Sequence, residues 1–306
     1  MLDSPDTLKT DHRQVHTFQP MGLGGILDAT LSLYRENLRL FLGIAAIYFV
    51  LIGLQEGIVV FLLERPSTPR LENFISDVDS VSDTFIYMLV VGVSVVASSE
   101  VYLGRRVTIQ AALRRFGSLF VEYLGASWIY LILCVVWTLD SFGESALVSL
   151  LRLALLPFLC FYLVSWVLYG PIVFNEEFTG QQALERSKLL VRGTWGRVFG
   201  IVLAIILFYL AIDYILGGIL GVVLALFGIA RDGSLMETVA SLLGMKYIVV
   251  RPTSMFLLIM YLIYLGAGTF TLPIYAIGVT LLYFDLRIRK EGFDIEMRVR
   301  NSQDLM

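Results

Sequence analysis

The stretch ILDATLSLYRENLRLFLGI, residues 26–44, has a second version in ALERSKLLVRGTWGRVFGI, residues 183–201. The two align without a gap at one constant offset, the difference between 183 and 26. The matched positions are Leu27 with Leu184, Asp28 with Glu185, Thr30 with Ser187, Leu33 with Leu190, Arg35 with Arg192, Gly43 with Gly200 and Ile44 with Ile201. A gapless match of this kind indicates that the fold uses one structural unit at least twice.

The first version has the spacing of an amphipathic helix. Its apolar side chains Leu27, Leu31, Tyr34 and Leu38 fall on one helical face, opposite a polar one. We therefore expect a helix that lies in the membrane interface and leads into a spanning segment. The second version follows Thr179-Gly180-Gln181-Gln182, a capping-box pattern that predicts a helix start.

A third segment, TIQAALRRFGSLF at 108–120, stands in an equivalent place before another apolar run. Its residues do not align with the other two. A third repeat and an ordinary basic helix before a span explain this segment equally well, so both interpretations stay open here.

Composition indicates a membrane protein. Of the 306 residues 57% are hydrophobic and 16% charged, against about 25% charged in soluble domains. Several apolar runs approach or exceed the roughly 20 residues that span a hydrocarbon core. We expect an all-α, polytopic membrane protein, because a helix satisfies its own backbone hydrogen bonds in lipid. The six expected transmembrane helices are 40–63, 84–103, 117–139, 153–174, 197–217 and 254–284.

These spans divide into three helical-hairpin units, each preceded by a cytoplasmic amphipathic helix. We expect a polar tail at 1–20, a single membrane domain at 21–292 and a second polar tail at 293–306. The units cover about 21–104, 105–178 and 179–292. Two apolar runs are too long for a simple crossing, so a break near Gly217-Gly218 and a kink near Pro273 are expected. Residues 218–252 are then either interfacial or re-entrant.

The positive charges predict sidedness. Most of the 23 Lys and Arg residues flank one set of span ends, namely the N-terminal segment, the 105–115 and 186–197 loops and the segment after 286. The positive-inside rule then predicts a multi-pass protein of the plasma (inner) membrane with both termini in the cytoplasm. Anionic lipid headgroups are expected partners of that face, and nothing indicates nucleic acid. The first 39 residues lack the apolar core of a cleavable signal peptide.

The segments PMGLGGILDATLSLYRENLRLFLGI (20–44), ALERSKLLVRGTWGRVFGI and TLPIYAIGVTLLYFDLRIRKEGFD (271–294) resemble a prokaryotic family of multi-spanning proteins. That family is labelled glycerophosphoryl diester phosphodiesterase membrane domain, and the similarity covers most of the chain. The resemblance implies fold and membrane location. It does not imply catalysis, since the enzyme in the family's label is a separate soluble barrel. No stretch here can form that barrel, and the only histidines are His12 and His16.

Two groups of residues are candidates for function. Glu56 and Asp213 fall at similar depth in the outer halves of two spans; a polar site and structural hydrogen bonding remain equal alternatives for them. The second group is an interfacial charge collar, in which Asp285 and Arg287 would pair with groups of the interfacial helices. Its candidate members are Arg35, Arg192, Asp285, Arg287, Arg289 and Lys290, with Asp28 and Glu185 as further partners. Glu100 and Glu122 are expected either to extend to the interface or to pair with nearby arginines.

The motifs HExxH, GxSxG and GxxxxGK[ST] are absent, so the sequence gives no reason to expect an enzyme. No cofactor is implied, and His12 and His16 have no third ligand for a metal. The leading hypothesis is a non-catalytic integral membrane protein, a scaffold or accessory subunit of a membrane complex or envelope process with a protein partner. The alternative is a small-molecule or lipid transporter with a polar site between the repeats.

Overall fold

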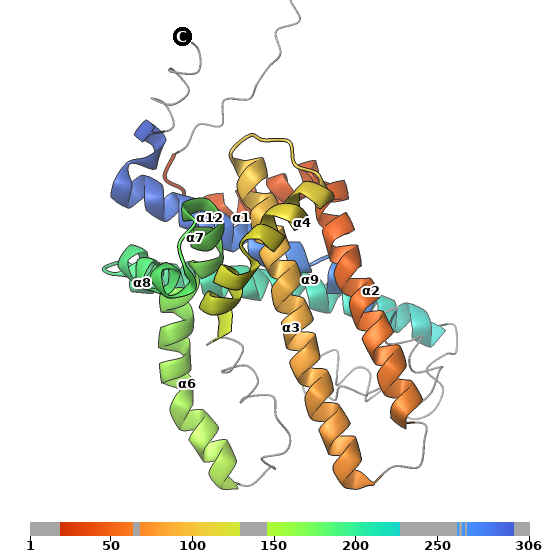
Figure 1. The fold of residues 1–306 in the computed structure, drawn as a ribbon. Coiled ribbons are helices and arrows are strands. Elements are labelled where there is room, and N and C mark those ends of the chain that lie inside the picture. Colours follow the sequence, from red (N-terminus) through yellow and green to blue (C-terminus); the bar gives the residue numbers. More distant parts are fainter. Residues whose placement is uncertain are drawn as a thin grey trace, which may run out of the picture.

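The computed structural model describes residues 19–63, 68–128, 146–226, 262, 265–266 and 268–296, and every regular element within those ranges is a helix (Figure 1). In chain order the helices are α1 (Leu23–Glu36), α2 (Leu38–Leu63), α3 (Pro69–Tyr102), α4 (Ile109–Ser118), the helical residues 120–128, α6 (Ala146–Trp166), α7 (Tyr169–Glu176), α8 (Gly180–Val191), α9 (Trp195–Leu226) and α12 (Leu272–Glu291). The expected all-α class is confirmed for this part of the chain.

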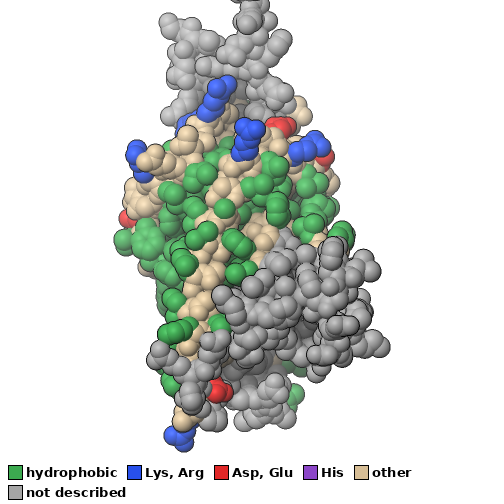
Figure 2. Space-filling model, turned by 90° about the vertical axis from the view of Figure 1, so that its right-hand side faces the viewer, with side chains coloured by type: hydrophobic (Ala, Val, Ile, Leu, Met, Phe, Trp, Pro, Cys, Tyr) green, Lys and Arg blue, Asp and Glu red, His purple; other side chains and the backbone are tan. Residues whose placement is uncertain are grey.

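Four of the described helical segments are long and apolar enough to cross a membrane: Leu38–Leu62, Arg70–Tyr102, Leu153–Glu176 and Trp195–Leu216. They overlap four of the six expected spans, but the second begins at Arg70, well before the expected start at 84. The other two, 117–139 and 254–284, lie only partly within the described residues. Figure 2 shows hydrophobic side chains over much of the face in view, with most of its Lys and Arg side chains gathered above them. This surface is that of a membrane protein.

One of the two expected interruptions is wrong. Helix α9 runs without a break from Trp195 to Leu226, through Gly217 and Gly218. A glycine inside a helix costs only about 1 kcal/mol relative to alanine, which does not force a break. Near Pro273 the chain is interrupted as expected: residues 270–271 form a turn between the helical residues 268–269 and α12, and Pro273 stands in the first turn of α12. Proline is favoured there, where its missing N–H would have had no helical partner.

Each of the three units has a short helix followed by a second helical segment, with a change of direction between them. The junctions are Asn37 between α1 and α2, Leu119 between α4 and residues 120–128, and Arg192 to Thr194 between α8 and α9. Equivalent positions are buried in all three units: Thr30, Ala112 and Ser187; Phe41, Tyr123 and Val198; Ile44, Ala126 and Ile201. The middle segment therefore follows the same packing pattern as the outer pair, although its residue types differ.

The predicted capping box at the start of α8 is confirmed: Gln182 Oε1 accepts the Thr179 N–H at 3.2 Å, and the Thr179 side chain accepts a backbone N–H in return. The close approach of α8 to the middle unit depends on glycine. A Cβ at Gly180 would overlap the backbone of Gly125.

The returning helices α3, α7 and α12, one from each unit, pack against one another. Each also packs against one short helix: α3 against α4, α7 against α8, and α12 against α1. The last pair joins the third unit to the first, so the order of contacts is cyclic. In Figure 1 the helices α1, α4, α7 and α12 meet near the upper end of the molecule, and α9 crosses behind α3 and α2.

Candidate functional site

A carboxylate near the end of each returning helix contacts the short helix beside it. Glu100 of α3 pairs with Arg115 of α4, with 3.7 Å between Oε1 and Nε, and with Arg105 at 3.2 Å. Glu176, the last residue of α7, binds Arg186 of α8 at 2.8 Å. Asp285 of α12 accepts the N–H of Met21, two residues before α1, at 2.7 Å. These three carboxylates and their partners form what we call the charge collar.

Asp285 lies in the most enclosed part of the charge collar. Its side chain is 0% exposed, and it faces two guanidinium groups, with Arg197 Nη2 at 2.8 Å and Arg289 Nε at 3.0 Å. Both arginines also donate to the Met21 carbonyl oxygen at 2.9 Å. A buried carboxylate is tolerated when it is paired and hydrogen-bonded in this way. The cluster ties the start of α1 to α9 and α12.

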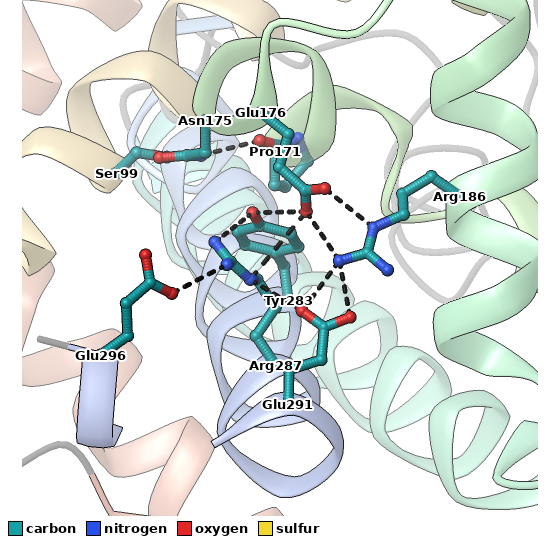
Figure 3. Close-up of polar contacts among 9 residues, drawn as sticks. All are labelled: Ser99, Pro171, Asn175, Glu176, Arg186, Tyr283, Arg287, Glu291 and Glu296. Atoms are coloured by element: carbon teal, nitrogen blue, oxygen red, sulfur yellow. Dashed lines mark hydrogen bonds and ion pairs between the residues drawn. The ribbon is translucent and has the colours of Figure 1, made fainter. Parts of the chain in front are cut away.

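The second cluster surrounds Glu176 (Figure 3). Arg186 lies between two carboxylates, with Nε 2.8 Å from Glu176 Oε2 and Nη2 2.6 Å from Glu291 Oε1. The Tyr283 hydroxyl donates to Glu176 Oε1 at 3.0 Å, and Arg287 Nη1 donates to the Tyr283 oxygen at 3.3 Å. Side chains from α7, α8 and α12 therefore share one network, which Figure 3 shows converging on Tyr283 and Arg287.

Both guanidinium groups of this cluster stay charged. Burial would lower the pKa of Arg186, but its hydrogen bonds to Glu176 and Glu291 outweigh burial and raise that pKa. The pKa of Arg287 is likewise raised against the effect of burial, by Tyr283 and by Glu176 and Glu291. The network therefore joins α7, α8 and α12 through two guanidinium groups that remain cationic.

The partners of Asp285 and Arg287 differ from the expected ones. Asp285 pairs with Arg197 and Arg289, and Arg287 pairs with Glu291 at 3.2 Å and lies 4.4 Å over the Phe293 ring. Phe293 is buried, although it was assigned to a polar tail.

The other collar candidates are at the surface. Arg35 and Arg192 are exposed. Lys290 reaches Arg192 only through its backbone, donating from Nζ to the carbonyl oxygen at 2.6 Å, and burial lowers the Lys290 pKa. Sequence reasoning missed Glu176, Arg186 and Arg197 as collar members. The signal that could have found Glu176 is its place, since an acidic residue follows each returning apolar run.

The two intramembrane candidates have different surroundings. Glu56 of α2 is 1% exposed. Asp213 of α9 is partly buried and accepts a hydrogen bond from Thr271 Oγ1 at 3.5 Å, beside the start of α12. Sequence analysis did not single out a further contact nearby, where Gln55 of α2 donates to Asp79 and Asp83 of α3. Among the described residues no group of three His, Cys, Asp or Glu side chains is placed to hold a metal ion.

Comparison of this chain with protein-family models, with curated proteins and with solved structures gave no match. The family resemblance of the three segments is therefore neither supported nor excluded by these comparisons. The site has to be interpreted from its own geometry, which joins three units through fixed charges at one end of the molecule.

Proposed function

We propose that this chain is a non-catalytic scaffold or accessory subunit of a membrane complex or envelope process. The observation that supports this function is the charge collar. Each of its carboxylates, Glu100, Glu176 and Asp285, binds groups of the neighbouring unit through hydrogen bonds or ion pairs of 2.7–3.7 Å. Charges used in this way hold elements in register rather than act on a substrate. An end held together by ion pairs and a broad apolar surface suit a membrane protein that positions other proteins.

The same proposal includes a topology. We place six spans in the plasma membrane of a prokaryote, with the short helices α1, α4 and α8 in the cytoplasmic interface and both termini in the cytoplasm. Support comes from the basic side chains that these helices and their flanks leave exposed, which are Arg35, Arg39, Arg105, Arg106, Arg114 and Lys188. Each basic residue near an anionic surface contributes about 1 kcal/mol of attraction. Membrane-impermeant labelling of a cysteine introduced after Glu296 tests the orientation: labelling in intact cells contradicts it.

The scaffold function is tested by reciprocal purification in mild detergent. A tag on this chain should recover a second protein in fixed ratio, and a tag on that protein should recover this chain. The variant Arg186→Gln, which removes the bridge between Glu176 and Glu291, should weaken the recovery. Glu185→Gln, an exposed neighbour on the same helix, is the control. Recovery of this chain without a second protein, or failure of the tagged second protein to recover this chain, contradicts the proposal.

Transport of a small molecule or lipid is the second candidate, and one observation favours it. The carboxylates of Glu56 and Asp79 are only 1% and 5% exposed within helices of spanning length. An acidic side chain at the bilayer centre costs on the order of 2.5–3.5 kcal/mol on insertion scales, so such residues often mark a pathway. Transport predicts that the combination of Glu56→Gln, Asp79→Asn and Asp213→Asn fails to complement a deletion strain at normal protein level. Full complementation rules this candidate out.

A further inference from the structure

A cavity of about 130 Å³ lies where the three returning helices meet. Val91 and Val95 of α3, Pro171 of α7 and Ala276 and Val279 of α12 contribute to its walls. The described lining residues include tyrosines and a threonine but no charged side chain. Neither Glu56 nor Asp213 is among them. The cavity is therefore a site distinct from both groups of candidates discussed above, and all three units contribute to it.

The wall formed by Tyr123 is fixed in place. Its hydroxyl donates to the Met88 carbonyl oxygen at 3.0 Å and accepts from the Tyr169 hydroxyl at 3.2 Å. Its ring stacks on Phe174, with 5.3 Å between centroids. On the α3 side, a Cβ at Gly92 would come within 2.9 Å of the Tyr123 ring, so this contact is already as close as packing allows. Walls held in this way keep the cavity open instead of collapsing into it.

Size and chemistry point to one class of ligand. A closed apolar cavity of about 150 Å³ in another protein stays dry and accepts benzene, so this cavity suits a segment of about six carbon atoms. A mostly apolar lining without a charged side chain does not compensate for the desolvation of a phosphate, an ammonium group or a metal ion. One wall is α3, a helix of spanning length, so the hydrocarbon available at this position is a lipid tail. We propose that the junction of the three units binds a segment of a membrane lipid's hydrocarbon chain.

This binding site goes beyond the scaffold function, and its test needs no protein partner. The full chain is placed in phosphatidylcholine nanodiscs that contain a phosphatidylcholine with a diazirine on one acyl chain. After illumination, the labelled peptides are mapped by mass spectrometry. The expected result is labelling at Val91, Val95 and Val279, which are only 8%, 3% and 3% exposed, as well as at outward residues such as Val50. Labelling confined to outward residues overturns the proposal.

Filling the cavity provides the second arm. Ala276→Phe should abolish labelling at Val91 and Val95 and leave labelling at Val50 unchanged. Because Ala276 is fully buried, Thr84→Phe, at a partly exposed lining position, serves as a milder variant if Ala276→Phe does not fold. The matched control is Val121→Phe, at a position 75% exposed, which should keep the wild-type pattern. Equal labelling of Val91 and Val95 in wild type and a folded filled variant also overturns the proposal.

A third arm identifies the source of the chain. Detergent-solubilised protein is illuminated with a diazirine fatty acid alone. Labelling of Val91 and Val95 by both probes supports a site that reads only the hydrocarbon chain. Labelling by the phospholipid alone supports a site that also needs the headgroup to place that chain. If neither probe labels these two residues, the proposal fails.

Discussion

Replacing Asp285 by asparagine isolates the charge at the centre of the collar. The substitution keeps the shape of the side chain and one oxygen that can still accept the Met21 N–H, now 2.7 Å from Oδ1. It removes the negative charge that faces Arg197 at 2.8 Å and Arg289 at 3.0 Å. The bond from Arg197 Nη2 to Oδ2 is therefore lost, because an amide NH2 cannot accept it. Arg289 Nε can still donate to the kept oxygen, but without charge assistance. The hydrogen bond between the first and third units can remain.

The expected loss can be worked from those contacts. A hydrogen bond to a charged group contributes about 1.5–3 kcal/mol. Arg197 and Arg289 are 30% and 38% exposed and keep their bonds to the Met21 carbonyl, so water and that oxygen compensate in part. The lower value, about 1.5 kcal/mol, applies to the lost bond from Arg197, and Arg289 loses only the difference between a charged and a neutral acceptor, about 0.5 kcal/mol. The sum is about 2 kcal/mol. At about 2–4 °C per kcal/mol for chains of this size, the melting temperature should fall by about 4–8 °C.

The assay is thermal unfolding of the detergent-solubilised protein, followed by circular dichroism. Asp28→Asn is the matched control, because it makes the same chemical change at an exposed position of α1 and should shift stability by less than about 0.5 kcal/mol. Charge reversal in Asp285→Lys should destabilise more than Asp285→Asn, since it adds a third cation to the cluster. If Asp285→Asn and Asp28→Asn melt at the same temperature, the collar does not hold the units together.

Two further predictions use the same assay. Gly180→Ala should cost about 1–3 kcal/mol because its Cβ would overlap the Gly125 backbone, whereas Gly117→Ala, with open space around its Cβ, should be neutral or stabilising; equal melting temperatures would refute this close approach. Ser187→Ala should cost about 1–3 kcal/mol, since it breaks buried hydrogen bonds to two α6–α7 backbone groups. The equivalent Thr30→Val loses only a hydrogen bond within its own helix, so it should destabilise the protein less than Ser187→Ala. A larger loss of stability for Thr30→Val would contradict the assigned contacts.

The outer repeats could be recognised from sequence because similar residues occupy equivalent buried positions. Thr30 and Ser187 are both small hydroxyl residues, and Ile44 and Ile201 are identical. The middle unit escaped recognition because packing constrains burial more than residue type. Where the first unit has Phe41 and the third Val198, the middle one has Tyr123, whose larger side chain and hydroxyl also serve the cavity.

The partners within the collar could not be predicted for a different reason. Asp285 had several exposed basic residues available in sequence, and electrostatic attraction alone does not choose among them. The choice of Arg197 over Arg192 depends on the junction at Arg192 to Thr194, after which α9 begins in a new direction. The break expected at Gly217-Gly218 failed for another reason: the small cost of a glycine in a helix does not end it, whereas the proline signal at Pro273 did mark a helix start.

The contact between Met21 and Asp285 spans 264 positions of the chain. Helix α1 is synthesised well before the carboxylate that accepts the N–H at its leading end. Helix α1 therefore lacks this neighbour while the chain up to Asp285 is translated and inserted. The contact can form only after Asp285 has been synthesised. A chain that stops short of this residue lacks the two carboxylate oxygens that bind Arg197 and Arg289. Its units stay incompletely joined, which exposes the chain to proteases.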